Sequence, residues 1–148
     1  MLDATNRVVM ITGSSRGIGK GVREVLRDAG FIIAAGVRRP EDFADGDRTS
    51  YHSYDAARNE DAAAFVDAVM ARYGRIQALV NVAGISRPAT YNTEDESGLD
   101  EMWEINAKAP VRLTRYALPH LRACGDGRVI NVVSVAGKSV KSANSLGY

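Results

Sequence analysis

A glycine-rich turn between a short apolar run and an amphipathic segment constrains the fold of this chain more than any other feature. Residues 7–12 (RVVMIT) form an apolar, largely β-branched run, as expected of a strand buried on both faces. Glycines follow at once, and the apolar residues after Gly17 share one helical stripe up to Gly30, a residue type that commonly ends helices. A helix that starts in this way offers free N–H groups and a partial positive charge to a phosphate.

Short apolar runs continue to alternate with segments of helical period, which is typical of a parallel sheet covered by helices. The expected strands cover residues 31–37, 49–54, 76–82 and 128–133, and the pattern is weakest in 49–54. The expected helices cover residues 59–73 and 97–123, the second with a break near Asn106 and a kink further on at its prolines. The core residues expected within these helices include Phe65, Met70 and Trp103.

The pattern as a whole predicts an α/β fold, a Rossmann-type doubly wound parallel sheet in three α/β/α layers. At 148 residues, with no repeat or linker, the chain is expected to form a single domain over residues 1–148.

Composition excludes several classes of function. The net charge is +1, from 19 basic and 18 acidic residues, so no global field points to nucleic acid or to a membrane. The single cysteine, Cys124, cannot form an internal disulfide, and no cluster of cysteines and histidines predicts a metal site. The N-terminal MLDATNR is charged where a signal peptide is apolar. We therefore expect a soluble, cytoplasmic protein that binds no metal.

The glycine turn predicts a dinucleotide site. Gly13 would permit the tight turn, Gly17 would let the backbone approach a diphosphate, and Gly19 would let the helix pack closely on the sheet. The Gly-Lys-Ser/Thr ending of a nucleotide-triphosphate loop is absent. The alternative is a glycine-rich turn without a ligand.

The spacing of these glycines, TG-x3-G-x-G, resembles that of the short-chain dehydrogenase/reductase family. Further residues match the family's elements in order along the chain: Asp55 after the third strand, Asn81-Val82-Ala83-Gly84 with one substitution, Asn106 in EINAK, Ser134 after the fifth strand, and Tyr148 fourteen positions later. The resemblance covers essentially the whole chain and implies a homodimer or homotetramer that acts on a small carbonyl or alcohol substrate.

The resemblance also implies roles for individual residues. The expected cofactor-binding residues are Gly13, Ser15, Arg16, Gly17, Ile18, Gly19, Arg38, Asp55, Asn81, Ala83 and Gly84. The expected catalytic residues are Asn106 in a proton relay, Ser134, which orients the carbonyl, and Tyr148, which delivers the proton. Family members carry a lysine four places beyond this tyrosine, and then a helix and further strands. We therefore expect the sheet to be incomplete at its C-terminal side, with the strand at 128–133 as an apolar edge.

The end of the second strand bears on which nicotinamide cofactor is bound. A Rossmann site selects NAD with an acidic residue about 20 positions beyond the glycines, or NADP with a nearby arginine. Arg38 stands at this place, and Arg16 in the glycine turn can approach the same 2′-phosphate, which favours NADP(H). Arg39 is expected to be a solvated surface charge. Glu41 and Asp42 leave NAD(H) open as the less favoured alternative.

Three functions compete at this point. The first is hydride transfer between NADP(H) and a carbonyl or alcohol, for which the protein must supply a hydrogen-bond donor and a proton source. The second is a catalytically silent module that only binds the dinucleotide. The third, a methyltransferase with a similar sheet, leaves Ser134 and Tyr148 without a purpose.

Overall fold

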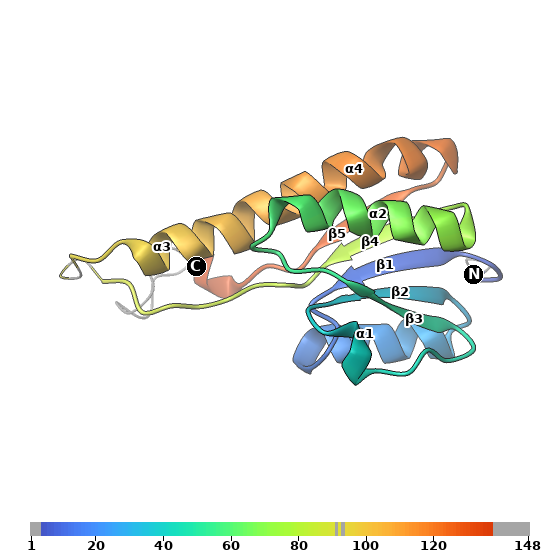
Figure 1. Cartoon of the computed structure of the whole chain (residues 1–148), viewed down its shortest axis with the longest axis horizontal. Coiled ribbons are helices and arrows are strands. Elements are labelled where there is room, and N and C mark those ends of the chain that lie inside the picture. Colours follow the sequence, from blue (N-terminus) through green and yellow to red (C-terminus); the bar gives the residue numbers. More distant parts are fainter. Residues whose placement is uncertain (1–3, 91, 93, 138–148) are drawn as a thin grey trace.

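A five-stranded parallel sheet forms the centre of the protein (Figure 1). The computed structural model describes residues 4–90, 92 and 94–137. The strands are β1 (Val8–Thr12), β2 (Ile32–Val37), β3 (Thr49–Ser53), β4 (Ala78–Asn81) and β5 (Arg128–Asn131). Their order in the sheet is β3-β2-β1-β4-β5, and every neighbouring pair is parallel. The predicted α/β class and Rossmann-type sheet are confirmed.

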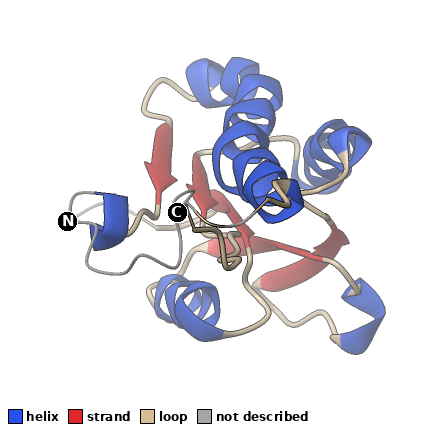
Figure 2. Cartoon of the chain, turned by 90° about the vertical axis from the view of Figure 1, so that its left-hand side faces the viewer, coloured by secondary structure: helices blue, strands red, loops and turns tan. Residues whose placement is uncertain are grey.

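Helices cover both faces of this sheet. They are α1 (Gly17–Asp28), α2 (Asn59–Tyr73), α3 (Ser97–Met102), the π-helix η2 (Trp103–Lys108) and α4 (Ala109–Ala123). Two 3-10 turns, η1 (Pro40–Asp42) and η3 (Val135–Gly137), follow β2 and β5. Helix α1 lies on one face, while α2 and α4 lie on the other, which gives the three layers seen from two sides in Figures 1 and 2.

Alternate residues of β1 face opposite layers, which explains why its apolar run is unbroken. Val8 and Met10 belong to the core beneath α2 and α4, and Val9 and Ile11 belong to the core beneath α1. All four side chains are at most 2% exposed. A strand covered on both faces must be apolar at every position, as the sequence pattern indicated.

Two of the three residues that were predicted to lie in the core of the helices pack there, and the third does not. Phe65 is 1% exposed, as predicted, and Met70 packs at the margin of the same core. The prediction for Trp103 is wrong, because its side chain is 61% exposed. The buried stripe of this helix passes through Met102, Ile105 and Ala109, spaced three and four residues apart, so the neighbouring Trp103 faces outward.

The long helical stretch at 97–123 is continuous. Near Asn106, where a break was expected, the hydrogen bonding changes to the wider π pattern of η2. Pro110 directly follows η2 near the start of α4, where the change of hydrogen-bonding pattern accommodates its missing N–H, and α4 continues through Pro119 to Ala123. The α2 bounds agree with the prediction, and Gly30 and Gly74 have the left-handed φ values of 100° and 67° expected at helix ends.

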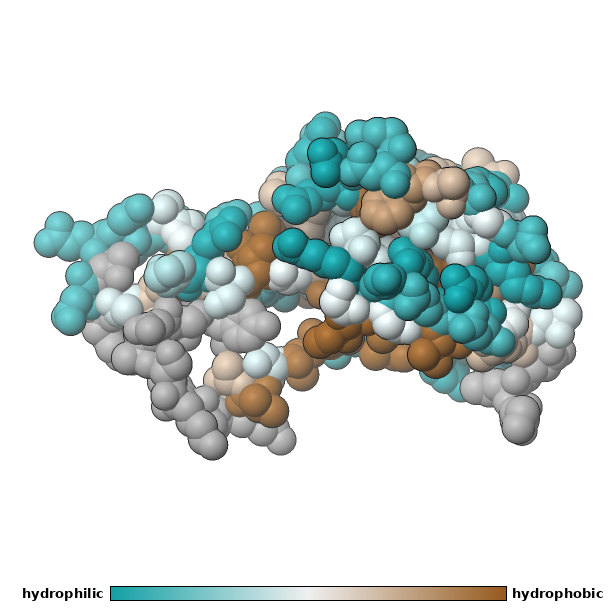
Figure 3. Space-filling view, turned by 90° about the horizontal axis from the view of Figure 1, so that it is seen from below, coloured by the Kyte–Doolittle hydropathy of each residue, from teal (hydrophilic) through white to brown (hydrophobic). Residues whose placement is uncertain are grey.

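Strand β5 is the apolar edge that we expected. It pairs with β4 alone, and its four residues are all exposed. Val129 is 40% and Ile130 52% exposed, and Val133, just beyond the strand, is 84% exposed. Figure 3, viewed from the side on which α1 lies, shows apolar surface bordering the central hollow of the molecule.

A polar network lies under the C-terminal half of α2. The Tyr73 hydroxyl donates to Ser50 Oγ at 2.9 Å, and Ser50 Oγ lies 2.7 Å from Nε2 of His52. The His52 ring also contacts Phe65, with the ring centres 5.5 Å apart. Burial lowers the pKa of His52, and the positive charge of Arg72 lowers it further, against the opposing effect of Asp45. The folded protein therefore favours the neutral imidazole.

This pKa shift predicts how stability changes with pH. The unfolded chain takes up a proton at His52 near its ordinary pKa of about 6.5, whereas the folded chain resists it until lower pH. The contribution of His52 to the free energy of unfolding should therefore be constant above that value and fall as the pH drops below it. Urea unfolding at a series of pH values measures this, and His52→Gln should flatten the dependence. His120→Gln is the control, and an equal flattening by it would contradict the assignment.

Candidate active site

The carboxyl ends of all five strands meet at one edge of the sheet. Since the chain runs from β1 to β2 on one side and reaches β4 on the other side of β1, the order reverses between β1 and β4. Open α/β sheets bind ligands in the crevice outside such a switch point. In Figure 1 the start of α1 lies at this edge, and the segment after β4 runs from it toward α3.

Close packing joins the glycine turn to the end of β4. Gly13 has a φ of 64°, and a Cβ there would lie 2.7 Å from the Ala83 nitrogen. A Cβ at Gly19 would lie 2.2 Å from the Gly13 carbonyl oxygen. Gly19 thus lets α1 pack closely on the turn itself, whereas the sequence suggested that it packs on the sheet. Any side chain at Gly13 or Gly19 would force the turn away from β4 or from α1.

Thr12, which the sequence analysis did not single out, fixes the same contact. Its side chain is 1% exposed, and Oγ1 accepts hydrogen bonds from the N–H groups of Val82 and Ala83, both at 3.1 Å. The sequence signals were its place at the end of a buried strand and its position as the threonine that opens the TG-x3-G-x-G spacing. The side chain satisfies two backbone donors that no strand partner reaches.

The start of α1 is open to an anionic ligand. Gly17 has a φ of 55°, and a Cβ there would meet nothing within 4 Å. Arg16 precedes the helix without a capping side-chain hydrogen bond, and the first turn holds no acidic residue. The N–H groups of this turn therefore keep their positive field, and Ser15, Arg16 and Ile18 are exposed around them.

These features fit a nicotinamide dinucleotide. Its diphosphate needs backbone N–H donors on a surface that the phosphates can approach closely. The glycines at the start of α1, which have no side chains, supply such a surface. Ser14 Oγ, directly beneath the turn, is buried and has no hydrogen-bond partner among the described residues. By contrast, the first turn of α2 carries Glu60 and Asp61, which oppose an anion there.

Charged residues stand at the ends of β2 and β3. Arg38 and Arg16 are exposed, and within the described part of the chain neither side chain has an ion pair or hydrogen bond. Arg39 pairs with Asp42 at 2.9 Å. Asp55, after β3, accepts the Ala57 N–H at 3.0 Å through one carboxylate oxygen. Two unpaired guanidinium groups thus lie on the segments that flank the α1 start.

Two asparagines hold the segment after β4 in different ways. Asn106 bonds both backbone groups of Ile85, since Oδ1 accepts from its N–H and Nδ2 donates to its carbonyl, each at 2.8 Å. Asn81 is 4% exposed, and its Nδ2 donates to Asn131 Oδ1 at 2.9 Å. The Asn81 side chain therefore joins β4 to β5, whereas Asn106 fixes the course of the chain past Gly84.

Ser134 lies on the segment after β5, at the same edge of the sheet. Its Oγ accepts the Ala136 N–H at 3.1 Å, at the start of η3, which leaves the hydroxyl proton for another acceptor. Tyr148, the predicted proton donor, lies outside the described residues. The structure thus brings the ends of β1, β4 and β5 to one edge and places Asn106 beside Gly84 there.

Two further properties concern the described residues as a whole. None of their helices has both the length and the apolar character that crossing a bilayer requires. No three of their His, Cys, Asp or Glu side chains gather where they could hold a metal ion.

Comparison with known proteins gives the family. The profile of the short chain dehydrogenases matches residues 7–148. Agropine synthesis reductase of Rhizobium rhizogenes is 38% identical over 139 residues, which are 90% of this chain and 32% of that protein. L-fucose dehydrogenase of Bos taurus is 34% identical over 88% of this chain and 50% of its own length. A short-chain dehydrogenase structure from Streptomyces avermitilis is 33% identical with a TM-score of 0.83, over 90% of this chain and 51% of that one.

The parallel sheet with helices on both faces defines a Rossmann-type fold. The chain belongs to the short chain dehydrogenase family, whose members use nicotinamide cofactors. The chain spans between a third and a half of the length of these relatives.

Proposed function

We propose that this protein is an NADP(H)-dependent oxidoreductase that transfers hydride between the nicotinamide and a carbonyl or alcohol substrate. The observation that carries the proposal is the uncapped, acid-free start of α1 at the switch point of the sheet. A dinucleotide diphosphate is the ligand that such a helix start binds in this fold.

The proposed cofactor contacts follow the edge of the sheet. The residues that would surround the diphosphate are Gly13, Ser15, Arg16, Gly17, Ile18 and Gly19. Asp55 would contact the adenine, and Asn81, Ala83 and Gly84 would border the cofactor at the end of β4. Of these, Asn81 would act by holding β4 against β5, because its side-chain amide is already engaged there.

Bound there, the nicotinamide supplies or accepts the hydride, and the chain supplies the polar groups around the substrate. Ser134 would orient the carbonyl with its hydroxyl proton, which is not used within η3. Tyr148 would donate the proton to the developing alkoxide. Asn106 would position the segment past Gly84 through its two bonds to Ile85, in addition to its proposed place in the proton relay.

NADP(H) is favoured over NAD(H) by the pairing of the charged groups. Arg38 and Arg16 have no side-chain partner within the described residues, whereas Asp42, the residue that a ribose hydroxyl of NAD(H) would need, is paired with Arg39. A 2′-phosphate needs such free, bidentate guanidinium groups.

Titration calorimetry with NADPH and NADH tests the cofactor assignment. NADPH should bind more tightly, and Arg38→Ala should weaken NADPH binding by about tenfold, the value of one charge-assisted hydrogen bond. NADH binding should change little, because NADH lacks the 2′-phosphate. Arg39→Ala is the matched control and should leave both affinities unchanged. Tighter binding of NADH than of NADPH would disprove this preference.

Turnover separates the enzyme from a catalytically silent dinucleotide-binding module. The complete gene product should oxidise NADPH in the presence of at least one member of a broad panel of aldehydes and ketones. Ser134→Ala should lower kcat by about 100-fold or more while leaving NADPH affinity unchanged, since a single donor to a developing oxyanion has about that effect. Binding of NADPH without turnover on any member would favour the silent module.

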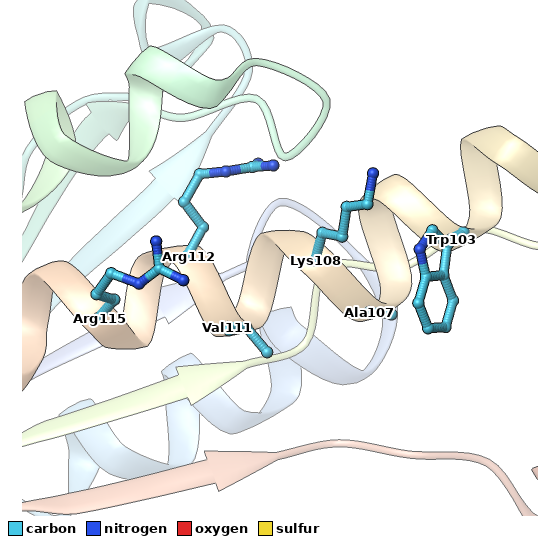
Figure 4. A pocket seen from close by; sticks show the side chains of 6 residues that line it. All are labelled: Trp103, Ala107, Lys108, Val111, Arg112 and Arg115. Atoms are coloured by element: carbon cyan, nitrogen blue, oxygen red, sulfur yellow. The ribbon is translucent and has the colours of Figure 1, made fainter.

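We propose further that the protein is cytoplasmic and forms a homodimer or homotetramer. The lone Cys124 suits a reducing compartment. An apolar stripe of Leu99, Trp103, Ala107 and Val111, spaced four residues apart, supports self-association. Trp103 and Val111 are each 61% exposed and border a hollow of about 340 Å³. Figure 4 shows their side chains on one side of the helix.

The charged residues beside this stripe are paired within the helix itself. Glu104 forms ion pairs with Lys108 and Arg112. These pairs leave the apolar stripe as the surface through which two copies, related by a twofold axis at Ala107, would pack antiparallel. The small Ala107 side chain would permit close approach at the axis.

Light scattering coupled to size exclusion measures this association. The complete gene product should be oligomeric, and Trp103→Glu should shift it toward smaller species by burying an unpaired charge in the interface. Val25→Glu is the control, because Val25 is 68% exposed on α1, across the sheet from the stripe. An unchanged mass for Trp103→Glu would show that another surface is used.

A further inference from the structure

Arg23, in the second turn of α1, is a buried arginine that directly contacts the glycine turn. The residue is 7% exposed, and its Nη1 donates to the Ser14 carbonyl at 3.0 Å. Its guanidinium carbon lies 5.5 Å from the centre of the Tyr51 ring, and Nη2 lies 3.5 Å from Glu24 Oε1. Burying a guanidinium costs free energy. The residue therefore needs a reason beyond filling space.

The contacts of Arg23 extend to the second segment of the candidate site. Tyr51 on β3 stacks against Phe43, with the ring centres 4.6 Å apart and the ring planes 15° apart. Phe43 directly follows η1, the turn that comes after Arg38 and Arg39. A continuous row of contacts thus joins the Ser14 carbonyl, Arg23, Tyr51 and Phe43, from the glycine turn to the segment after β2.

The direction of the Ser14 carbonyl decides where the next N–H points. None of the described peptide bonds is cis. In a trans peptide the carbonyl and the following N–H point in opposite directions. Because the Ser14 carbonyl is turned inward to Arg23, the Ser15 N–H faces away from the protein interior, toward the open space at the start of α1.

We propose that Arg23 is a positioning residue for the cofactor: its buried guanidinium holds the Ser14–Ser15 peptide in the orientation that presents the Ser15 N–H to the diphosphate. This inference rests on the proposed function. The diphosphate is common to NADPH and NADH, so Arg23 governs the affinity for both. Arg38, by contrast, would act on NADPH alone.

Arg23→Met tests the proposal, with Arg27→Met as the matched control. Arg27 lies one turn further along α1 and pairs with Asp28 at 2.8 Å, away from the glycine turn, so its removal takes away the same charge. Calorimetric titration well below the melting temperature should show the Kd of Arg23→Met raised about tenfold for both NADPH and NADH, the loss expected for one hydrogen bond from a charged group. Arg27→Met should stay within about twofold of the unchanged protein for both, because it makes no such bond.

Conservative variants keep the test decisive if Arg23→Met does not fold. Arg23→Lys retains a donor for the Ser14 carbonyl but loses the planar stack, and Tyr51→Leu retains the guanidinium but removes the ring beside it. Each should raise the Kd for both cofactors by a smaller factor than Arg23→Met. A purely structural role would lower the melting temperature of these variants without changing either affinity.

The possible outcomes distinguish the two proposals. If the unchanged protein binds neither cofactor, the proposed function fails and the positioning role fails with it. If it binds NADPH and the folded Arg23 variants bind equally well, only the positioning role of Arg23 is overturned. A loss confined to NADPH would also overturn it, since that result would place Arg23 at the 2′-phosphate.

Discussion

The close approach of the ends of β1 and β4 is the contact on which the rest of the site depends. Thr12 Oγ1 accepts from two backbone N–H groups of the segment after β4, and Gly13 packs where any Cβ would lie 2.7 Å from the Ala83 nitrogen. This contact sets the separation of the two strands at the switch point, and so it determines the position of the helix that starts there. Gly19 completes it by letting α1 lie directly on the Gly13 carbonyl.

The electrostatics of the site depend on the absence of acidic residues from the first turn of α1 as well as on the arginines beside it. The first turn of α1 has neither an acidic side chain nor a capping hydrogen bond, so its N–H groups remain available. Arg16 and Arg38, which have no side-chain partner among the described residues, lie on neighbouring segments, while Arg39 is neutralised by Asp42. Positive charge therefore concentrates at one end of the sheet although the chain as a whole has a net charge of only +1.

Two apolar surfaces stand out against this polar edge. One is β5 with the valines that follow it, and the other is the outer stripe of α3, η2 and α4 around Trp103. Both arise from elements that lie at the margin of the layers: β5 has a strand on one side only, and the α3 to α4 stretch turns just one stripe to the sheet. Contiguous apolar surface of this kind commonly marks a contact with further polypeptide.

The periodicity of the sequence was enough to predict the fold, because a strand buried on both faces must be apolar throughout and a helix on a sheet must show one stripe. Periodicity indicated the sheet class and the α2 bounds, whereas the apolar edge at β5 was expected from the resemblance to the family. The ends of the strands were less predictable, since the apolar runs of β4 and β5 extend beyond their hydrogen-bonded residues. Trp103 was misplaced because a large aromatic residue suggests burial, whereas its one-residue offset from the stripe of Met102 and Ile105 decides its exposure.

The candidate site, like the fold, could be predicted only in part from the sequence. Local spacing identified the glycine turn and Arg38 after β2, because each lies directly at the end of a predictable element. The resemblance to the family pointed to the polar residues Asp55, Asn81 and Ser134 after the parallel strands. Only the tertiary structure decided which side chains meet across the fold: Thr12 with the backbone after β4, Asn81 with Asn131, and Arg23 with Ser14 and Tyr51. Such contacts depend on the order and register of the strands, which are determined by packing between distant segments and leave no periodic trace in the sequence.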